Sequence, residues 1–173
     1  MADILFTIDK YVVLVNFIAF LMIAPHSRQA LSCFVSVAFL LLANTIMFWC
    51  EIKLKTFYVS EPDFVKHIWF FVFGFLDLIC IMFIYRFHTM FGISPSRTSK
   101  SVIQSFNMLV IVQAIAHFDR FIFQTEYILE YYSYAIPAIN IGIATATLYA
   151  ATKLNLFSYS NKRVETEKTT GVN

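Results

Sequence analysis

Apolar runs of about twenty residues recur along this chain, and short polar breaks separate them. A helix rises about 1.5 Å per residue, so each run matches the roughly 30 Å hydrocarbon thickness of a bilayer. This rhythm predicts an all-α, polytopic integral membrane protein that is surrounded by a lipid bilayer. The composition agrees, because only 14% of the residues are charged, against about 25% in an ordinary soluble domain.

The runs predict about five transmembrane helices in a single domain, residues 1–157, and a flexible polar cytoplasmic tail, residues 158–173. The spans are expected at about 11–24, 30–50, 68–85, 101–123 and 134–151. The end of the fourth span is open, because Asp119 and Arg120 can mark the water interface or lie in a helix that continues to Phe123. Pro137 is expected in the first turn of the fifth span, where a proline is tolerated.

The distribution of Lys and Arg selects the orientation, because cytoplasmic segments carry the excess of these residues. With the amino terminus outside, the inside segments hold eight of the 13 Lys and Arg residues, and the outside segments hold five. We therefore predict a cytoplasmic carboxyl terminus, in a bacterial inner membrane or a plasma membrane. The net charge of +2 is too small to indicate a nucleic-acid partner.

Small residues recur every four positions in the fifth span, at Ala138, Gly142, Ala146 and Ala150. Helices in lipid gain little from burying apolar surface, so close backbone approach at small residues holds them together. We expect this ridge to be a helix-packing surface; the alternative is a face thinned for the passage of a substrate. Association with copies of the same chain, or with other membrane subunits, is expected as well.

Polar residues at membrane depth are the main functional signal. An acidic side chain at the bilayer centre costs about 2.5 to 3.5 kcal/mol on insertion scales, so Asp77 should face the bundle interior or a wet cavity. Gln113, His117 and Arg120 follow the spacing i, i+4, i+7 and share one face of a helix. The candidate residues of a transport path are therefore Asp77, Gln113, His117, Arg120, Asn16 and Asn140.

Three functions fit these residues. The leading hypothesis is a small channel or transporter-like protein for protons or small ions. The second is a non-catalytic membrane subunit or interaction protein, in which the polar groups only lock the bundle at about 0.6 kcal/mol per contact. The third is a b-type haem electron-transfer subunit, with axial ligands drawn from the pairs His26 and His88 or His67 and His117.

Signatures of enzymes are missing from the sequence. HExxH, GxSxG, P-loop and GxGxxG patterns are all absent. We therefore predict no catalytic residues, no metal and no cofactor. The three cysteines, Cys33, Cys50 and Cys80, form no ligand cluster and are expected to act as small packing residues.

Overall fold

The computed structural model describes residues 2–28, 30–125 and 127–169. The structure is 90% helix, and these residues include no strand. The five helices are α1 (Ala2–Ile23), α2 (Leu31–Tyr58), α3 (Pro62–Met90), α4 (Arg97–Phe118) and α5 (Tyr127–Thr169). A 3₁₀ turn (Ala24–His26) follows α1, and a π-helical turn (Asp119–Phe123) continues α4. The all-α prediction is confirmed.

Four of the described helices, α2 to α5, are long and apolar enough to cross a membrane. The fifth, α1, contributes a shorter apolar segment, Lys10–His26. Large apolar side chains such as Phe71 and Phe75 cover the outside of the bundle, whereas Asn16 and Asp77 are fully buried. Apolar residues outside and polar residues inside are the distribution that lipid surroundings favour, so the fold indicates a membrane location.

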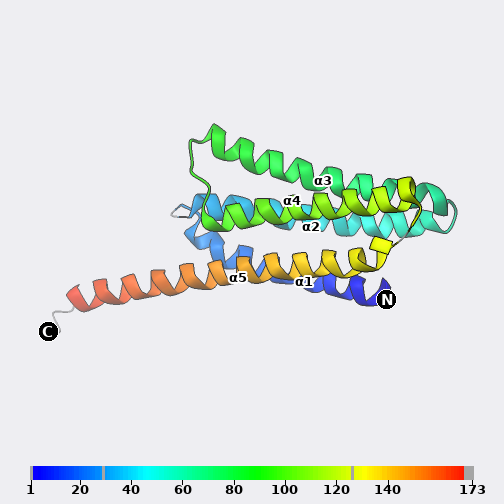
Figure 1. Ribbon diagram of the computed structural model, residues 1–173. Helices are drawn as coiled ribbons and strands as arrows, with labels where there is room; N and C mark the ends of the chain where they lie inside the picture. The colour runs from blue at the N-terminus through cyan, green and yellow to red at the C-terminus, as the bar shows by residue number, and fades with distance from the viewer. Residues whose placement is uncertain (1, 29, 126, 170–173) are drawn as a thin grey trace.

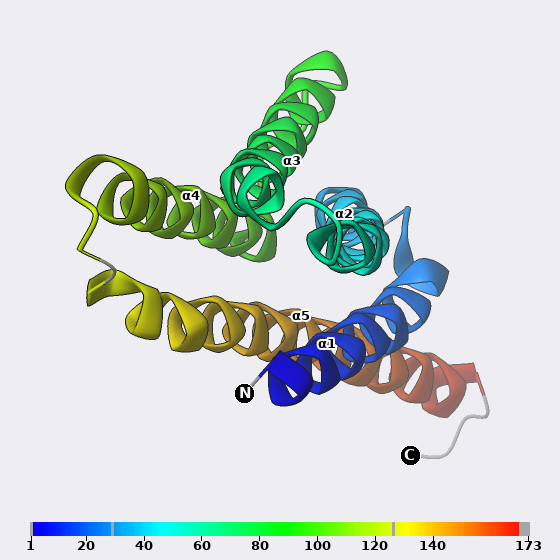
Figure 2. The same ribbon diagram turned by 90° about the vertical axis from the view of Figure 1, so that its right-hand side faces the viewer.

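Successive helices run antiparallel, and the two termini lie at opposite ends of the bundle (Figure 1). Helix α1 packs against α5 and α2, α3 packs against α2 and α4, and α4 packs against α5 (Figure 2). We call the end that holds the α2–α3 and α4–α5 connections the outer end, because the sequence predicts it outside. The inner end is the opposite one, beyond which α5 projects. Which end faces the cytoplasm stays a prediction.

Local chemistry explains where the helices begin and end. Pro62 lies in the first turn of α3, where its missing N–H has no partner to lose. Ser96 precedes α4, and its hydroxyl accepts a hydrogen bond from the backbone N–H of Ser99 at 3.1 Å. Gly92, between α3 and α4, has a φ of +61°, which a residue without Cβ adopts readily.

Helix α5 differs from the sequence prediction at both ends. It continues to Thr169, so residues 158–169 are helical where a flexible tail was predicted. Lys, Arg and Glu in this segment are good helix formers, and adding turns to an existing helix avoids the cost of nucleation. Residues 170–173 of the predicted tail lie outside the described residues. Because α5 begins at Tyr127, Pro137 lies inside the helix and the expectation of a first-turn proline is wrong.

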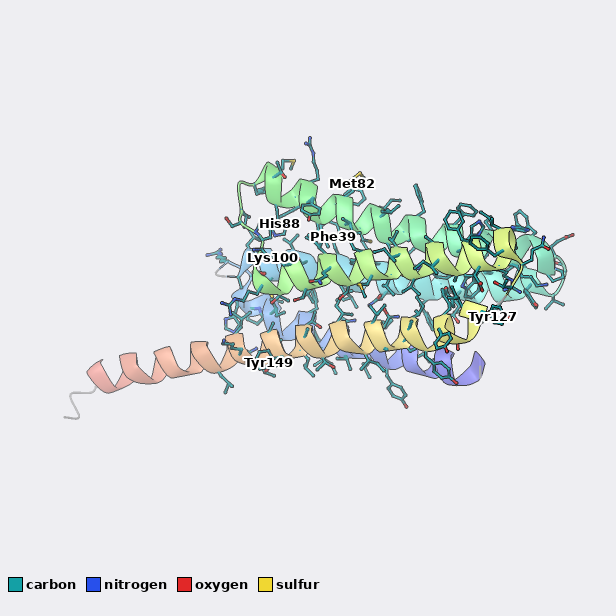
Figure 3. All side chains as sticks on the ribbon, viewed as in Figure 1. Phe39, Met82, His88, Lys100, Tyr127 and Tyr149 are labelled. Atoms are coloured by element: carbon teal, nitrogen blue, oxygen red, sulfur yellow. The ribbon has the colours of Figure 1, made fainter. Side chains whose placement is uncertain are left out.

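Two apolar clusters fill the bundle on the inner side of its middle. The larger one joins α2, α3, α4 and α5 and consists of Leu40, Ala43, Cys80, Ile84, Val102, Ile103, Phe106, Leu109 and Ile143. The smaller one joins α1, α2 and α5 and consists of Ala19, Ile23, Cys33, Val37 and Ala151. Met82, by contrast, points away from the bundle (Figure 3).

A polar cluster of Ser32, His88, Ser96 and Ser99 connects α2, α3 and α4 at the inner end. The Ser32 hydroxyl lies 2.7 Å from His88 Nε2 and 2.8 Å from the Ser99 hydroxyl, and it accepts from the backbone N–H of Ser96 at 2.8 Å. His88 Nδ1 lies 2.7 Å from the carbonyl of Ile84 and donates to it. These contacts fix the inner ends of three helices, and the outer half of the bundle holds the pocket described next.

Candidate functional site

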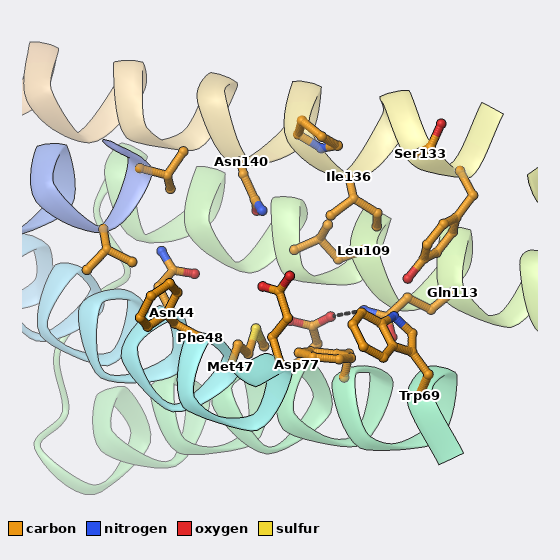
Figure 4. A pocket seen from close by; sticks show the side chains of 16 residues that line it. Asn44, Met47, Phe48, Trp69, Asp77, Leu109, Gln113, Ser133, Ile136 and Asn140 are labelled. Atoms are coloured by element: carbon orange, nitrogen blue, oxygen red, sulfur yellow. Dashed lines mark hydrogen bonds between the residues drawn. The ribbon is translucent and has the colours of Figure 1, made fainter. Parts of the chain in front are cut away.

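A pocket of about 140 Å³ lies between all five helices in the outer half of the bundle (Figure 4). It extends from residues at the outer end, such as Glu51 and Tyr132, to Asp77 near the middle of α3. The larger apolar cluster lies next to it on the inner side and shares Leu109 with it. The pocket is lined by Val12, Val13, Asn44, Met47, Phe48, Glu51, Trp69, Phe73, Asp77, Leu109, Gln113, Tyr132, Ser133, Ile136, Pro137 and Asn140.

Helical periodicity brings these residues to one place. On α3, Trp69, Phe73 and Asp77 recur every four residues and therefore share one face. On α4, Leu109 and Gln113 are likewise four residues apart. Helices α2 and α5 each add residues over two turns of one face, so the wall is built from the interior faces of the bundle.

Asp77 and Gln113 form the polar centre of the pocket. Asp77 is 0% exposed, and its Oδ2 accepts a hydrogen bond from Gln113 Nε2 at 2.9 Å (Figure 4). Asp77 Oδ1 and Gln113 Oε1 are also buried, and neither has a partner in the described part of the chain. Gly74 lies beside the amide of Gln113, and a Cβ at position 74 would be 3.5 Å from Gln113 Oε1. Two acceptor oxygens thus lack donors in this pocket.

Two other polar side chains extend this centre. Asn140, a predicted site residue, reaches toward the pocket from α5 (Figure 4). Asn44 lines it from α2, and its Nδ2 is buried without a partner among the described residues. The pocket therefore offers amides on three helices around one carboxyl group.

Asn16 belongs to a different contact. Its Oδ1 accepts a hydrogen bond from the Thr147 hydroxyl at 3.0 Å, and both side chains are fully buried between α1 and α5. Asn16 does not line the pocket. Asn16 therefore contributes a contact that joins two helices, and its place on a transport path stays a prediction.

His117 and Arg120 do not line the pocket with Gln113 either. His117 lies one turn farther toward the outer end than Gln113. Its ring contacts an aromatic cluster of Phe70, Phe71 and Phe121, with 4.7 Å between the ring centroids of His117 and Phe71. The π-helical turn after Phe118 has more residues per turn than an α-helix and ends the shared face. Arg120 lies over the ring of Phe121 at 5.9 Å. The predicted polar track is therefore divided between the pocket and an aromatic cluster.

Asp119 lies within helical backbone, so α4 and its π-helical turn together continue to Phe123. The side chain of Asp119 is buried and accepts hydrogen bonds from the Thr125 hydroxyl and from the backbone N–H of Ile128, the latter at 2.9 Å. Ile128 lies in the first turn of α5, whose N–H groups lack helical partners. Asp119 thus caps α5 and fixes the outer connection beside the pocket.

The predicted ridge of small residues lies largely outside the contacts within this chain. Ala138 and Gly142 are exposed, and a Cβ at Gly142 would meet no atom within 4 Å. Ala150 packs against the smaller apolar cluster, and Ala146 is half-buried. The face of α5 that packs inward instead carries Ile143, Ala144, Thr147 and Ala151.

Sequence reasoning missed Glu51 and the aromatic wall. Glu51 is buried at the outer end of the pocket and forms an ion pair with Lys55 one turn later. An acidic residue at the end of an apolar run is ordinary, so its sequence position carries little signal. The only sequence signal for the aromatic wall was the high aromatic content of the spans, which does not single out Phe48, Phe73 or Tyr132.

The histidines lie apart from this pocket. Both ring nitrogens of His88 contact protein groups, so His88 has no free nitrogen for a haem iron. His26 Nε2 lies 3.2 Å from Asn155 Oδ1, and His67 stacks on Phe121 at 3.7 Å between ring centroids. No cluster of His, Cys, Asp and Glu that could hold a metal ion occurs among the described residues.

Comparisons with protein-family models, with curated proteins and with solved structures find no match to this chain.

Proposed function

We propose that this chain is a small membrane transport protein for protons or small cations, with Asp77 as the group that binds them. The observation that carries the proposal is the buried Oδ1 of Asp77, which has no partner in the described structure and belongs to a pocket wall. A carboxyl group at membrane depth is costly, and a structural role would be expected to satisfy both of its oxygens. We therefore assign a cation or a proton as the partner of this oxygen.

The apolar cluster on the inner side of the pocket favours a gated carrier over an open pore. Leu40, Ile84 and Phe106 are fully or almost fully buried directly inward of Asp77. Such a layer blocks ions in this conformation, so transport requires a second conformation in which Asp77 faces the inner side. Rocking of helices around a site near the midplane is how many secondary transporters alternate access.

Flux through proteoliposomes tests the proposal. We expect the parent protein to move protons, read by a pH-sensitive dye, or alkali cations, read by ion-sensitive dyes. Asp77→Asn keeps the shape and removes the charge, so the flux should fall at least tenfold. Ser36→Ala is the matched control, because Ser36 is a buried polar residue on α2 that does not line the pocket. Equal flux in the parent and in Asp77→Asn would remove the role of Asp77.

A non-catalytic subunit is the second candidate, and the exposed small residues favour it. Open space beside Gly142 on an apolar helix suits the close approach of a helix from another chain. Crosslinking in native membranes should then capture a second copy or another subunit, and the purified chain should carry no flux. Monomer alone after crosslinking would argue against this candidate.

A further inference from the structure

We propose that the pocket at Asp77 binds a small organic ammonium ion, a protonated amine that carries an apolar group about the size of a benzene ring. The proposal rests on the proposed function, because it names the class of cation that the same carboxyl group would bind. It goes further in assigning the aromatic wall to the ligand.

The charge of the pocket selects a cation. Among the described residues that line it, Glu51 and Asp77 are acidic, and none is Lys, Arg or His. Glu51 is paired with Lys55, so an anionic ligand would meet the charge of Asp77 with no cationic residue of the pocket wall to balance it. A neutral apolar ligand would leave the Asp77 carboxylate buried and uncompensated, which is costly.

The two unsatisfied oxygens select a hydrogen-bond donor. Asp77 Oδ1 and Gln113 Oε1 are both acceptors, and both are buried without a partner in the described part of the chain. Because Gln113 Nε2 donates to the other oxygen of Asp77, the remaining atom of that amide is its acceptor. An ammonium group has up to three N–H donors and a positive charge, so it can satisfy an amide oxygen and a carboxylate together.

The rest of the pocket wall suits an organic cation better than a bare metal ion. Ions such as Ca²⁺ take six to eight oxygen ligands, whereas Phe48, Trp69, Phe73 and Tyr132 supply much of this wall. Aromatic rings attract organic ammonium ions and also bury apolar groups. The lining is therefore divided between a polar centre at Asp77 and an aromatic region toward the outer end.

The dimensions set the size of the ligand. The pocket has a volume of about 140 Å³, and a cavity of about 150 Å³ holds benzene. Trp69 precedes Asp77 by eight residues on α3, which places the two about 12 Å apart along the helix axis. A phenyl ring joined to an ammonium group by two carbons spans about half of this distance, so its ring would reach the level of Phe73, about 6 Å from Asp77 along the helix axis.

Trp69 provides the readout for a binding test. Trp49 and Trp69 are the two tryptophans of the chain, and Trp49 is exposed and does not line the pocket. In a Trp49→Phe background, phenethylammonium should therefore change the fluorescence saturably in detergent micelles. The neutral 2-phenylethanol and the anionic 3-phenylpropionate should bind at least tenfold more weakly.

Two variants separate the polar and apolar parts of the site. Asp77→Asn should weaken phenethylammonium binding at least tenfold, and Ser36→Ala should leave it unchanged, with thermal unfolding showing that both variants remain folded. Phe73→Ala should weaken phenethylammonium more than methylammonium. Equal binding of phenethylammonium and 2-phenylethanol, or full binding by Asp77→Asn, would overturn the proposal.

Combined results distinguish this proposal from the proposed function. If Asp77-dependent proton flux occurs but phenethylammonium does not bind, the amine assignment fails and the transport function stands. If phenethylammonium binds at Asp77 but liposomes show no flux of protons, alkali ions or the amine, the ligand assignment stands and transport fails.

Discussion

Removing the central polar pair should make the bundle more stable, if Asp77 and Gln113 serve function. The change is Asp77→Leu combined with Gln113→Met, because Leu branches at Cγ as Asp does and Met has about the same length as Gln. The pair supplies one hydrogen bond between helices, and such bonds average about 0.6 kcal/mol in membranes. This stabilisation is smaller than the cost of the two buried oxygens without partners, since each of them costs about 1 to 3 kcal/mol.

We therefore expect the double variant to unfold with a free energy at least about 1 kcal/mol above that of the parent. Gln113→Met alone leaves Asp77 Oδ2 without its donor but also removes the unpartnered Gln113 Oε1. These two terms offset, so this variant should lose only the hydrogen bond, about 0.6 kcal/mol. Unfolding in mixed micelles, followed by the circular dichroism of the helices, measures all four proteins of the cycle. A double variant no more stable than the parent would refute the reasoning, because the pair would then contribute to stability as a structural lock.

Three further predictions concern contacts outside the pocket. Thr147→Val removes the hydroxyl that donates to Asn16 and should lower the free energy of unfolding by about 0.6 to 1.7 kcal/mol, whereas Thr147→Ser should stay near the parent in the same micelle assay. Ser32→Ala leaves a buried imidazole nitrogen without its hydroxyl partner and should cost about 1 to 3 kcal/mol. Ser36→Ala removes a buried hydroxyl that has no partner among the described residues, so a loss as large as that of Ser32→Ala would contradict this account. Gly142→Leu should keep the fold, since nothing lies within 4 Å of the added Cβ, and should abolish self-association; crosslinked dimers that persist would exclude Gly142 from the contact.

Four of the helices were predictable from hydropathy because their apolar runs are as long as a bilayer is thick, and the first run is shorter. Their ends were not, because charged residues that suit the water interface are also good helix formers. Helix α2 continues past Glu51 to Tyr58, and α5 continues to Thr169. Hydropathy locates the part of a helix that is apolar, and the helix extends as far as its backbone can continue.

The sequence predicted how deep in the membrane the site residues lie. It did not predict which face of each helix points toward the site. Asp77 and Gln113 were identified because polar groups near the middle of a span need partners, and they are hydrogen-bonded to each other. Asn16 occupies a similar depth but bonds to Thr147 instead. Which face of each helix points at which neighbour depends on packing among all five, and one sequence does not encode that rotation in a readable way. His117 lies one turn beyond Gln113 and packs against the aromatic cluster instead of lining the pocket.

Pro137 marks a point at which α5 can bend. The proline lies in the pocket wall and inside a helix that continues to Thr169, and its ring removes one backbone hydrogen bond at that point, where helices bend most easily. Inward of Pro137, buried residues such as Thr147 and Ala151 hold α5 in the bundle. A change in the bend would therefore move the shorter outer segment, which begins at Tyr127 and carries Tyr132 and Ser133 of the pocket wall, and so would alter the width of the pocket.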